Sequence, residues 1–143
     1  MSCTALGLRV AVPGTPKAKK SVAEGFHGPY NPSANDMRKF KAILRASKKF
    51  PPECSTYKGP LKIHIKSYFA RPLSHLKRHN KGLKSKAPRE MFQKPDADNI
   101  AKFVGDCLSG IAYKDDAQIV SNTSEKFWCV RNERVEIELE YLL

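Results

Sequence analysis

Carboxylates gather in one part of this 143-residue chain, between residues 94 and 118, on either side of an apolar stretch. Asp96 and Asp98 lie two residues apart, beside Pro95, which favours an extended backbone. An extended backbone points residues i and i+2 to the same side, so these two carboxylates can converge. Asp115 and Asp116 form a second acidic pair beyond the apolar stretch. Hard oxygen ligands of this kind suit Mg²⁺, and the spacing therefore predicts a Mg²⁺ site.

Such a site suits the cleavage of a phosphodiester. A bound divalent metal lowers the pKa of its water and polarises the phosphoryl group. Asp96 and Asp98 would supply two ligands from one extended segment, and Asp116 would supply a third from a later turn. Lys102 follows Asp98 by one helical turn, so its ammonium group can reach the same site. There it would stabilise developing negative charge or position the scissile phosphate.

Each of these residues also has a purely structural explanation. Asp96 or Asp98 could cap the helix that follows, although both cannot occupy one cap. The 115–116 pair could belong to an ordinary turn, and Lys102 could form a weak surface ion pair with Asp98 or Asp106. A calcium-binding EF-hand is excluded, because the glycine and glutamate that its loop requires are missing at the corresponding positions.

The charge of the chain is strongly positive and unevenly placed. The formal net charge is +12, with a sequence pI of about 9.7, which indicates a polyanionic partner. Residues 1–95 contain 21 Lys and Arg against 4 Asp and Glu, whereas residues 96–143 contain 5 against 10. A basic body with an acidic centre is typical of an enzyme that holds a phosphate backbone and brings metal to it. A solvated surface of the ribosomal type would explain the lysines but not the clustered aspartates.

The basic residues are concentrated in residues 71–94, which contain a single acid, Glu90. Few apolar residues interrupt this segment, so we expect a flexible loop that becomes ordered on nucleic acid. A second basic run, residues 17–20, follows the first predicted strand and has a solvated charge run as its simpler explanation. The predicted DNA contacts are Lys17, Lys19, Lys20, Arg71, Lys77, Arg78, Lys81, Lys84, Lys86, Arg89, Lys94 and Asn99.

Apolar periodicity predicts the elements that must position these residues. Alternation with period two predicts strands over residues 8–12, 61–69 and 135–141, and the apolar weight of residues 127–128 predicts a further strand over 119–130. Helical spacing predicts helices over 36–49 and 100–111. Residues 24–35, rich in Gly and Pro, are expected to form a long irregular connection. The order β-α-β-α-β-β predicts an α+β fold over residues 1–143, with a small mixed sheet of about four strands packed with two main helices.

The last two predicted strands are expected to form a hairpin around a turn at residues 132–133. The final strand carries an acidic face of alternating glutamates, Glu136, Glu138 and Glu140. We expect this face to pair across strands with Lys62 and Lys66, a structural role that leaves these glutamates out of the site.

The cysteines and the hydropathy bound the remaining possibilities. Cys3, Cys54, Cys107 and Cys129 are far apart, with no Cys-x-x-Cys pair, so a zinc ribbon is not expected. Cys107 and Cys129 fall in apolar elements and are predicted to be buried, reduced thiols. No apolar run is long enough to span a membrane and no signal peptide is visible, so we expect a cytoplasmic protein without membrane association or a small-molecule cofactor.

The acidic motifs resemble those of the RusA family of Holliday junction resolvases. Residues 94–102 read Lys-Pro-Asp-Ala-Asp-Asn-Ile-Ala-Lys, and residues 115–120 read Asp-Asp-Ala-Gln-Ile-Val. The family pattern is Asp-x-Asp-Asn-Leu-x-Lys, then a helical Asp-x-Leu, here residues 106–108, and then Asp-Asp-x-Gln-Val. The order and spacing of all three elements make this similarity far more specific than one Asp-x-Asp pair. Weaker similarity extends back through residues 68–74 and 16–17.

The resemblance implies a Mg²⁺-dependent endonuclease, with Mn²⁺ as a substitute, that acts as a homodimer on branched DNA in a bacterial or phage-infected cell, in association with the nucleoid. By position, Asp96, Asp98 and Asp116 correspond to the metal-binding acids and Lys102 to the catalytic-site lysine; Asp115 matches a family position beside them and is counted with the metal ligands. Lys94 takes the place of a basic residue that some relatives carry directly before the first aspartate. Two other functions stay open: a non-catalytic basic DNA-binding module, and a nuclease for flaps or forks.

Overall fold

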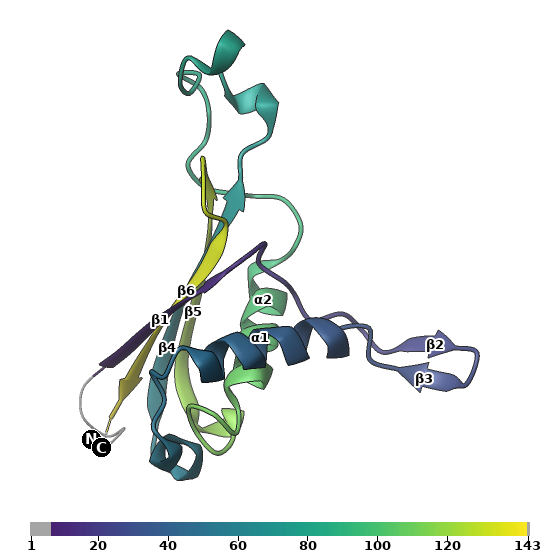
Figure 1. The fold of residues 1–143 in the computed structure, drawn as a ribbon, viewed down its shortest axis with the longest axis vertical. Helices are drawn as coiled ribbons and strands as arrows, with labels where there is room; N and C mark the ends of the chain where they lie inside the picture. The colour runs from purple at the N-terminus through teal and green to yellow at the C-terminus, as the bar shows by residue number, and fades with distance from the viewer. Residues whose placement is uncertain (1–6, 143) are drawn as a thin grey trace.

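The structure, a computed structural model, describes residues 7–142; Cys3 lies outside the described residues. A four-stranded mixed sheet forms its centre, in the order β1-β6-β4-β5 (Figure 1). β6 pairs antiparallel with both β1 and β4, and β4 pairs parallel with β5. The strands are β1 (Gly7–Pro13), β4 (Leu61–Ala70), β5 (Ile119–Cys129) and β6 (Arg134–Tyr141), and the helices are α1 (Ala34–Ala46) and α2 (Ala97–Leu108).

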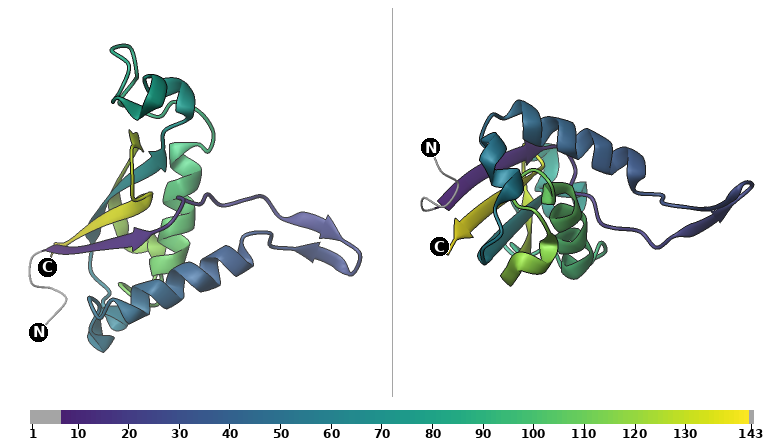
Figure 2. Two further views of the ribbon diagram at one scale, coloured as in Figure 1. Left: turned by 45° about the horizontal axis from the view of Figure 1, so that its top comes forward. Right: turned by 90° about the horizontal axis from the view of Figure 1, so that it is seen from below.

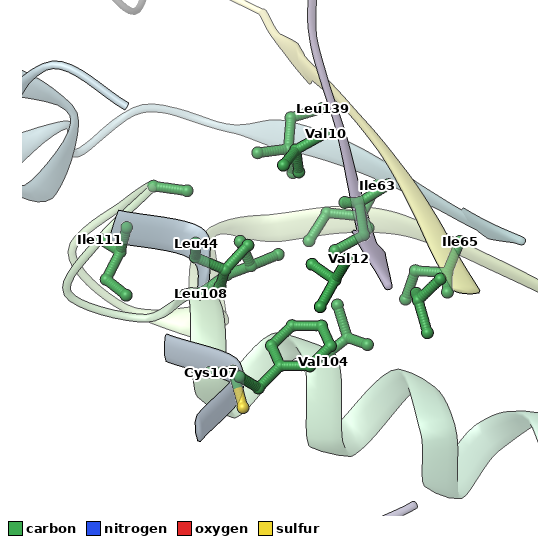
Figure 3. Packing of buried hydrophobic residues seen from close by; sticks show 14 of the residues in the cluster. Val10, Val12, Leu44, Ile63, Ile65, Val104, Cys107, Leu108, Ile111 and Leu139 are labelled. Atoms are coloured by element: carbon green, nitrogen blue, oxygen red, sulfur yellow. The ribbon is translucent and has the colours of Figure 1, made fainter. Parts of the chain in front are cut away.

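Alternation along the strands gives the sheet one apolar face, and both helices cover it (Figure 2). Figure 3 shows how Val12 of β1, Ile63 of β4 and Leu108 of α2 meet in this core. The two helices also contact each other, and the rings of Phe40 and Phe103 pack edge to face at 5.4 Å between centroids. Burial of this face supplies the main driving force for folding. The predicted α+β fold with two helices and a mixed four-stranded sheet is confirmed.

The expected hairpin between the last two strands is wrong, because β4 lies between β5 and β6. Residues 130–133 cross the end of β4 to join them. Strands two positions apart are about 10 Å from each other, a distance that four residues can span. β5 is instead the parallel partner of β4, and α2 forms part of the crossover that a parallel pair requires.

The outer face of the sheet carries the expected charge pairing. Lys62 lies opposite Glu140, and Lys66 lies opposite Glu136. Arg9 pairs with Glu138 on the same face, with 3.5 Å between Nε and Oε1. The predicted pairing of the acidic face with Lys62 and Lys66 is therefore confirmed, and these charges belong to the structure of the sheet.

Two connections are more regular than their sequences indicate. In place of an irregular stretch, β2 (Ala23–Gly25) and β3 (Gly28–Tyr30) form a short hairpin that projects from the body (Figures 1 and 2). Strands of three residues, rich in Gly and Pro, leave no periodic signal to detect. The basic segment 71–94 contains two 3₁₀ turns, Leu73–His75 and Arg78–Asn80, and its residue Glu90 forms a bridge with Phe127 of β5.

Of the two cysteines predicted to be buried, Cys107 is buried and Cys129 is only partly so. Cys107 is fully buried, and burial raises the pKa of its thiol to about 12. Cys129 is only half-buried, because it lies at the end of the edge strand β5. Within residues 7–142, no helix is long and apolar enough to cross a bilayer.

Candidate active site

A groove of about 660 Å³ runs between α2 and the edge strand β5 and contains most of the predicted catalytic residues. We call it the α2 groove. Its polar lining comes from Lys19, Asp98, Lys102, Asp106, Asp116, Asn122 and Ser124. A larger hollow of about 1060 Å³ lies over the outer face of the sheet and contains none of the predicted catalytic or metal-binding residues.

The polar wall of the groove follows from the apolar side of α2. Ile100, Phe103 and Val104 are at most 1% exposed and face the core, so the stripe at 98, 102 and 106 must face away from it. Ser124 Oγ donates a hydrogen bond to the Ala97 carbonyl at 2.9 Å, which joins the start of α2 to β5. The apolar periodicity of one helix thereby aligns two carboxylates and a lysine along the groove.

Just beyond the end of the groove at the start of α2, which we call the upper end, Asp96 pairs with Lys94, with 2.8 Å between Oδ1 and Nζ. The hydrogen bond and the positive charge of Lys94 hold the pKa of Asp96 below its usual value. Asp96 occupies the N-cap position of α2, yet its side chain makes no capping hydrogen bond. Its carboxylate therefore faces the lysine and does not close the helix end. Lys126 fixes the backbone before Asp96, since Nζ donates to the Gln93 and Pro95 carbonyls.

The opposite end of the groove, beside Asp106 and Asp116, is here called the lower end. Segments that are remote in sequence meet there. Lys19 Nζ lies 2.7 Å from Asp106 Oδ2, and this contact raises the pKa of Lys19. The Lys19 N–H also donates to the Asn99 carbonyl at 2.9 Å, so the basic loop is tied along α2. A hydrogen bond with Asp115, some burial and the negative charges of Asp115 and Asp106 raise the pKa of Asp116. Negative charge accumulates here, and Lys19 offsets part of it.

The Asp-Asp-Ala-Gln sequence builds the turn that presents Asp116. Asp115 Oδ1 accepts the Ala117 N–H at 3.1 Å, and Gln118 Oε1 accepts the Asp115 N–H at 2.7 Å, forming a capping box. Gln118 Nε2 also donates to the carbonyls of Tyr57 and Gly59, at 2.8 and 2.9 Å. Asp115 and Gln118 thus hold the turn, while Asp116 projects into the α2 groove.

The carboxylates are spread along the groove. Asp98 and Asp106 are eight residues apart on α2, which is about 12 Å along a helix axis. Lys102 lies between them, outside the ion pairs formed within residues 7–142. In this part of the chain no three His, Cys, Asp or Glu side chains lie close enough together to hold a metal ion as they stand. The structure brings Asp98, Lys102 and Asp116 into one groove and leaves Asp96 outside its lining.

The predicted DNA contacts differ in their exposure and in their contacts with the rest of the protein. Arg71 and Arg89 have structural contacts: Arg71 Nη1 donates to the Pro88 carbonyl at 2.7 Å, and the Arg89 guanidinium lies 5.0 Å from the centroid of the Phe127 ring. Asn99 is half-buried beside the basic loop. The other predicted contacts are exposed, apart from the ion pairs of Lys19 and Lys94: Lys17, Lys20, Lys77, Arg78, Lys81, Lys84 and Lys86.

Sequence reasoning missed three contributors to the site. Asp106 was expected only as part of the helical motif or as a surface partner of Lys102, although its spacing of four from Lys102 places it on the same helix face. Lys19 was expected to contact DNA, yet it lies in the groove against Asp106. No sequence pattern marks Lys126, because its contact with the loop before Asp96 depends on strand pairing.

The fold and groove together define a class: a small basic α+β protein that gathers carboxylates and a lysine on one helix, as an enzyme of phosphodiester cleavage would. Residues 12–140 match the family model for endodeoxyribonuclease RusA. The chain belongs to the RusA endodeoxyribonuclease family, whose members act on branched DNA junctions, and the predicted resemblance is confirmed. It is also 31% identical over 137 residues to "Uncharacterized protein YqaN" of Bacillus subtilis (strain 168), an alignment that covers 91% of this chain and 93% of that protein.

Proposed function

We propose that this endodeoxyribonuclease resolves four-way DNA junctions, using Mg²⁺ and nicking symmetrically as a homodimer. The observation that carries the proposal is the α2 groove, where Asp98, Lys102 and Asp116 meet in an otherwise basic protein. A basic surface attracts the phosphate backbone, and the carboxylates of the groove offer oxygen ligands to a divalent cation.

The donor chemistry of the groove fits Mg²⁺ or Mn²⁺. Its carboxylates offer hard oxygen ligands, and the raised pKa of Asp116 reports negative charge that a divalent cation would neutralise. Asp96, Asp98 and Asp116 are the proposed ligands. Asp115, counted with the ligands on sequence grounds, is assigned to hold the turn, because its Oδ1 already accepts a backbone hydrogen bond. When bound, the cation would activate water and polarise the phosphoryl group.

The protein side chains have separate tasks around the reacting phosphate. Lys102 is exposed on the groove wall between the two ends, where its ammonium group can contact a non-bridging phosphate oxygen. Lys94 and Lys19 pair with carboxylates at either end and offset part of their negative charge before DNA arrives. The exposed lysines and arginine of residues 77–86 would hold the arms of the junction.

A two-fold dimer suits this reaction. A four-way junction presents two strands related by a two-fold axis, and an isologous dimer would place one α2 groove at each of them. Paired nicks at symmetric positions are the expected product.

The test is a cleavage assay on a labelled four-way junction, a linear duplex and a flap, each with Mg²⁺ or with chelator. We expect paired symmetric nicks in the junction, only with metal, and a much slower reaction on the duplex. Asp96→Asn is expected to lose cleavage and keep junction binding, since phosphate contacts lie elsewhere. Normal cutting by Asp96→Asn would reject its assignment as a ligand.

The same assay distinguishes the other functions. Tight binding without any cleavage, in every metal, would identify a non-catalytic DNA-binding module. Faster cutting of the flap than of the junction would identify a flap or fork nuclease. Sedimentation of the protein with and without the junction determines whether two copies act together.

A further inference from the structure

Phe92 is an exposed aromatic residue that neither the fold nor the proposed chemistry uses. Its exposed fraction is 77%, whereas its neighbour Met91 is 5% exposed and belongs to the core. Single exposed apolar side chains are common on protein surfaces. Phe92 differs from such residues in two ways: the backbone on both sides of it is fixed, and the charge around it is positive.

The backbone around Phe92 is fastened to β5. The Met91 N–H donates to the Lys126 carbonyl at 3.1 Å, and the Met91 side chain is buried. On the other side, Lys126 Nζ donates to the carbonyls of Gln93 and Pro95. Because both neighbours are held, Phe92 cannot turn into the core without breaking these hydrogen bonds. The ring is thus presented to solvent by an ordered support.

This support places Phe92 in the segment that leads into Asp96 and the start of α2. Phe92 precedes Asp96 by four residues, so their Cα atoms are at most about 14 Å apart. Between them, Lys94 forms the ion pair with Asp96. Figure 1 shows this stretch as the arc that leads from the sheet to the start of α2. The ring is therefore within reach of a DNA strand that is bound at Asp96.

The chain segment that carries the ring is cationic. Residues 84–94 contain four Lys and Arg and one Glu, and the Lys94 side chain is 84% exposed. A flat apolar ring among positive charges matches a ligand that carries both negative charge and flat apolar surfaces. Nucleic acid has this combination, since its phosphates meet the cations while the face of a base stacks on the ring.

We propose that Phe92 stacks on an unpaired nucleobase beside the cleaved phosphodiester and thereby favours branched DNA over duplex. The inference rests on the proposed function and adds to it the residue that recognises the branch. In a duplex both faces of each base are covered by neighbouring bases, whereas at a branch point a base face becomes accessible. Stacking on Phe92 can therefore add to the binding free energy at a branch point but not on a duplex.

The experiment uses a four-way junction with one 2-aminopurine at the branch point and a duplex with the same label, each titrated in chelator so that nothing is cut. The wild-type protein should change the fluorescence of the branch-point label, because the base leaves its neighbours. Phe92→Ala should bind the junction about 10-fold more weakly and lose this signal, with little change on the duplex. Phe92→Trp should retain both. Phe26→Ala is the matched control, since Phe26 is 98% exposed at the tip of the β2–β3 hairpin, and it should behave as wild type.

Three results would overturn the inference: wild-type binding and fluorescence in Phe92→Ala, an equal loss on junction and duplex, or an equal loss in Phe26→Ala. A conversion of dimer to monomer in Phe92→Ala would also overturn it, because the ring would then belong to a protein interface. Failure of the proposed function has a different signature, in which the wild-type protein neither binds nor cuts junctions in Mg²⁺. A wild-type protein that cuts normally beside an unaffected Phe92→Ala removes only the stacking role.

Discussion

The two ends of the α2 groove have similar composition and different origins. The upper end, with Lys94, Asp96 and Asp98, is contained in five consecutive residues. The lower end joins Lys19, Asp106 and Asp116, which come from a loop, a helix and a turn. Each end pairs carboxylates with one lysine, yet only the upper one can be recognised as a local motif.

The difference shows how a short motif depends on distant support. The upper pair is largely exposed, and exposed ion pairs contribute little to stability. The lower end rests on the turn at residues 109–118, which Tyr113 ties to α2 through a hydrogen bond of 2.7 Å from its hydroxyl to the Gly105 carbonyl. A change in this turn should displace Asp116 and leave Asp96 in place.

The largest expected effect tests whether the two ends serve one reaction. Asp98→Asn and Asp116→Asn should each reduce single-turnover cleavage of a four-way junction by about 100-fold or more, because each removes a metal-binding charge. Junction affinity, measured in chelator, should change little. Glu140→Gln, an exposed carboxylate on the outer face of the sheet, is the control and should cut normally. Normal cutting by either Asn variant would restrict the site to the other end.

The next effect concerns the basic segment rather than the groove. Replacing Lys81, Lys84 and Lys86 together with Gln should weaken junction binding by about 10-fold or more, since each phosphate contact adds nearly one unit to the slope of log affinity against log salt. The slope should fall by up to about 2.7 while the cleavage rate at saturating protein stays unchanged. An unaltered slope would exclude these lysines from the DNA contact.

A smaller effect should distinguish the two ends of the groove by how much each contributes to the stability of the protein. Gln118→Ala removes three hydrogen bonds at the lower end and should lower the free energy of unfolding by about 2–3 kcal/mol, as measured by urea titration. It should also slow cleavage, because Asp116 loses its support. Lys94→Gln at the upper end should leave the urea midpoint unchanged. Equal midpoints in both variants would contradict the distinction between a local and an assembled end.

The smallest effect is in the carboxyl titrations of the metal-free protein. The pKa of Asp96 is lowered by Lys94, and the pKa of Asp116 is raised by Asp115 and Asp106, so Asp116 should be protonated first as the pH falls. Lys19 opposes the rise at Asp116, and Lys19→Gln should therefore raise that pKa further without moving Asp96. Carbon-13 NMR of the aspartate carboxyls measures both. A lower pKa for Asp116 than for Asp96 would reverse the electrostatic comparison.

Most of the fold could be predicted because its elements carry strong periodicity. The alternating glutamates of β6 indicated that its acidic face lies opposite Lys62 and Lys66 of β4, and the apolar stripe of α2 gave the orientation of Asp98, Lys102 and Asp106. Strand order was harder, because a four-residue connection between β5 and β6 suits either a hairpin or a crossing over β4. The β2–β3 hairpin is too short for periodicity to reveal.

The sequence by itself determined the identity of the acidic motif, the helix that carries it and the basic character of its surroundings, because these depend on neighbouring residues and composition. Only the tertiary structure decided that Lys19 lies against Asp106, that Gln118 holds the turn of Asp116 and that Lys126 supports the loop before Asp96. The physical reason is that these contacts join segments far apart in the chain. Their geometry exists only after the sheet has paired and the core has closed beneath α2.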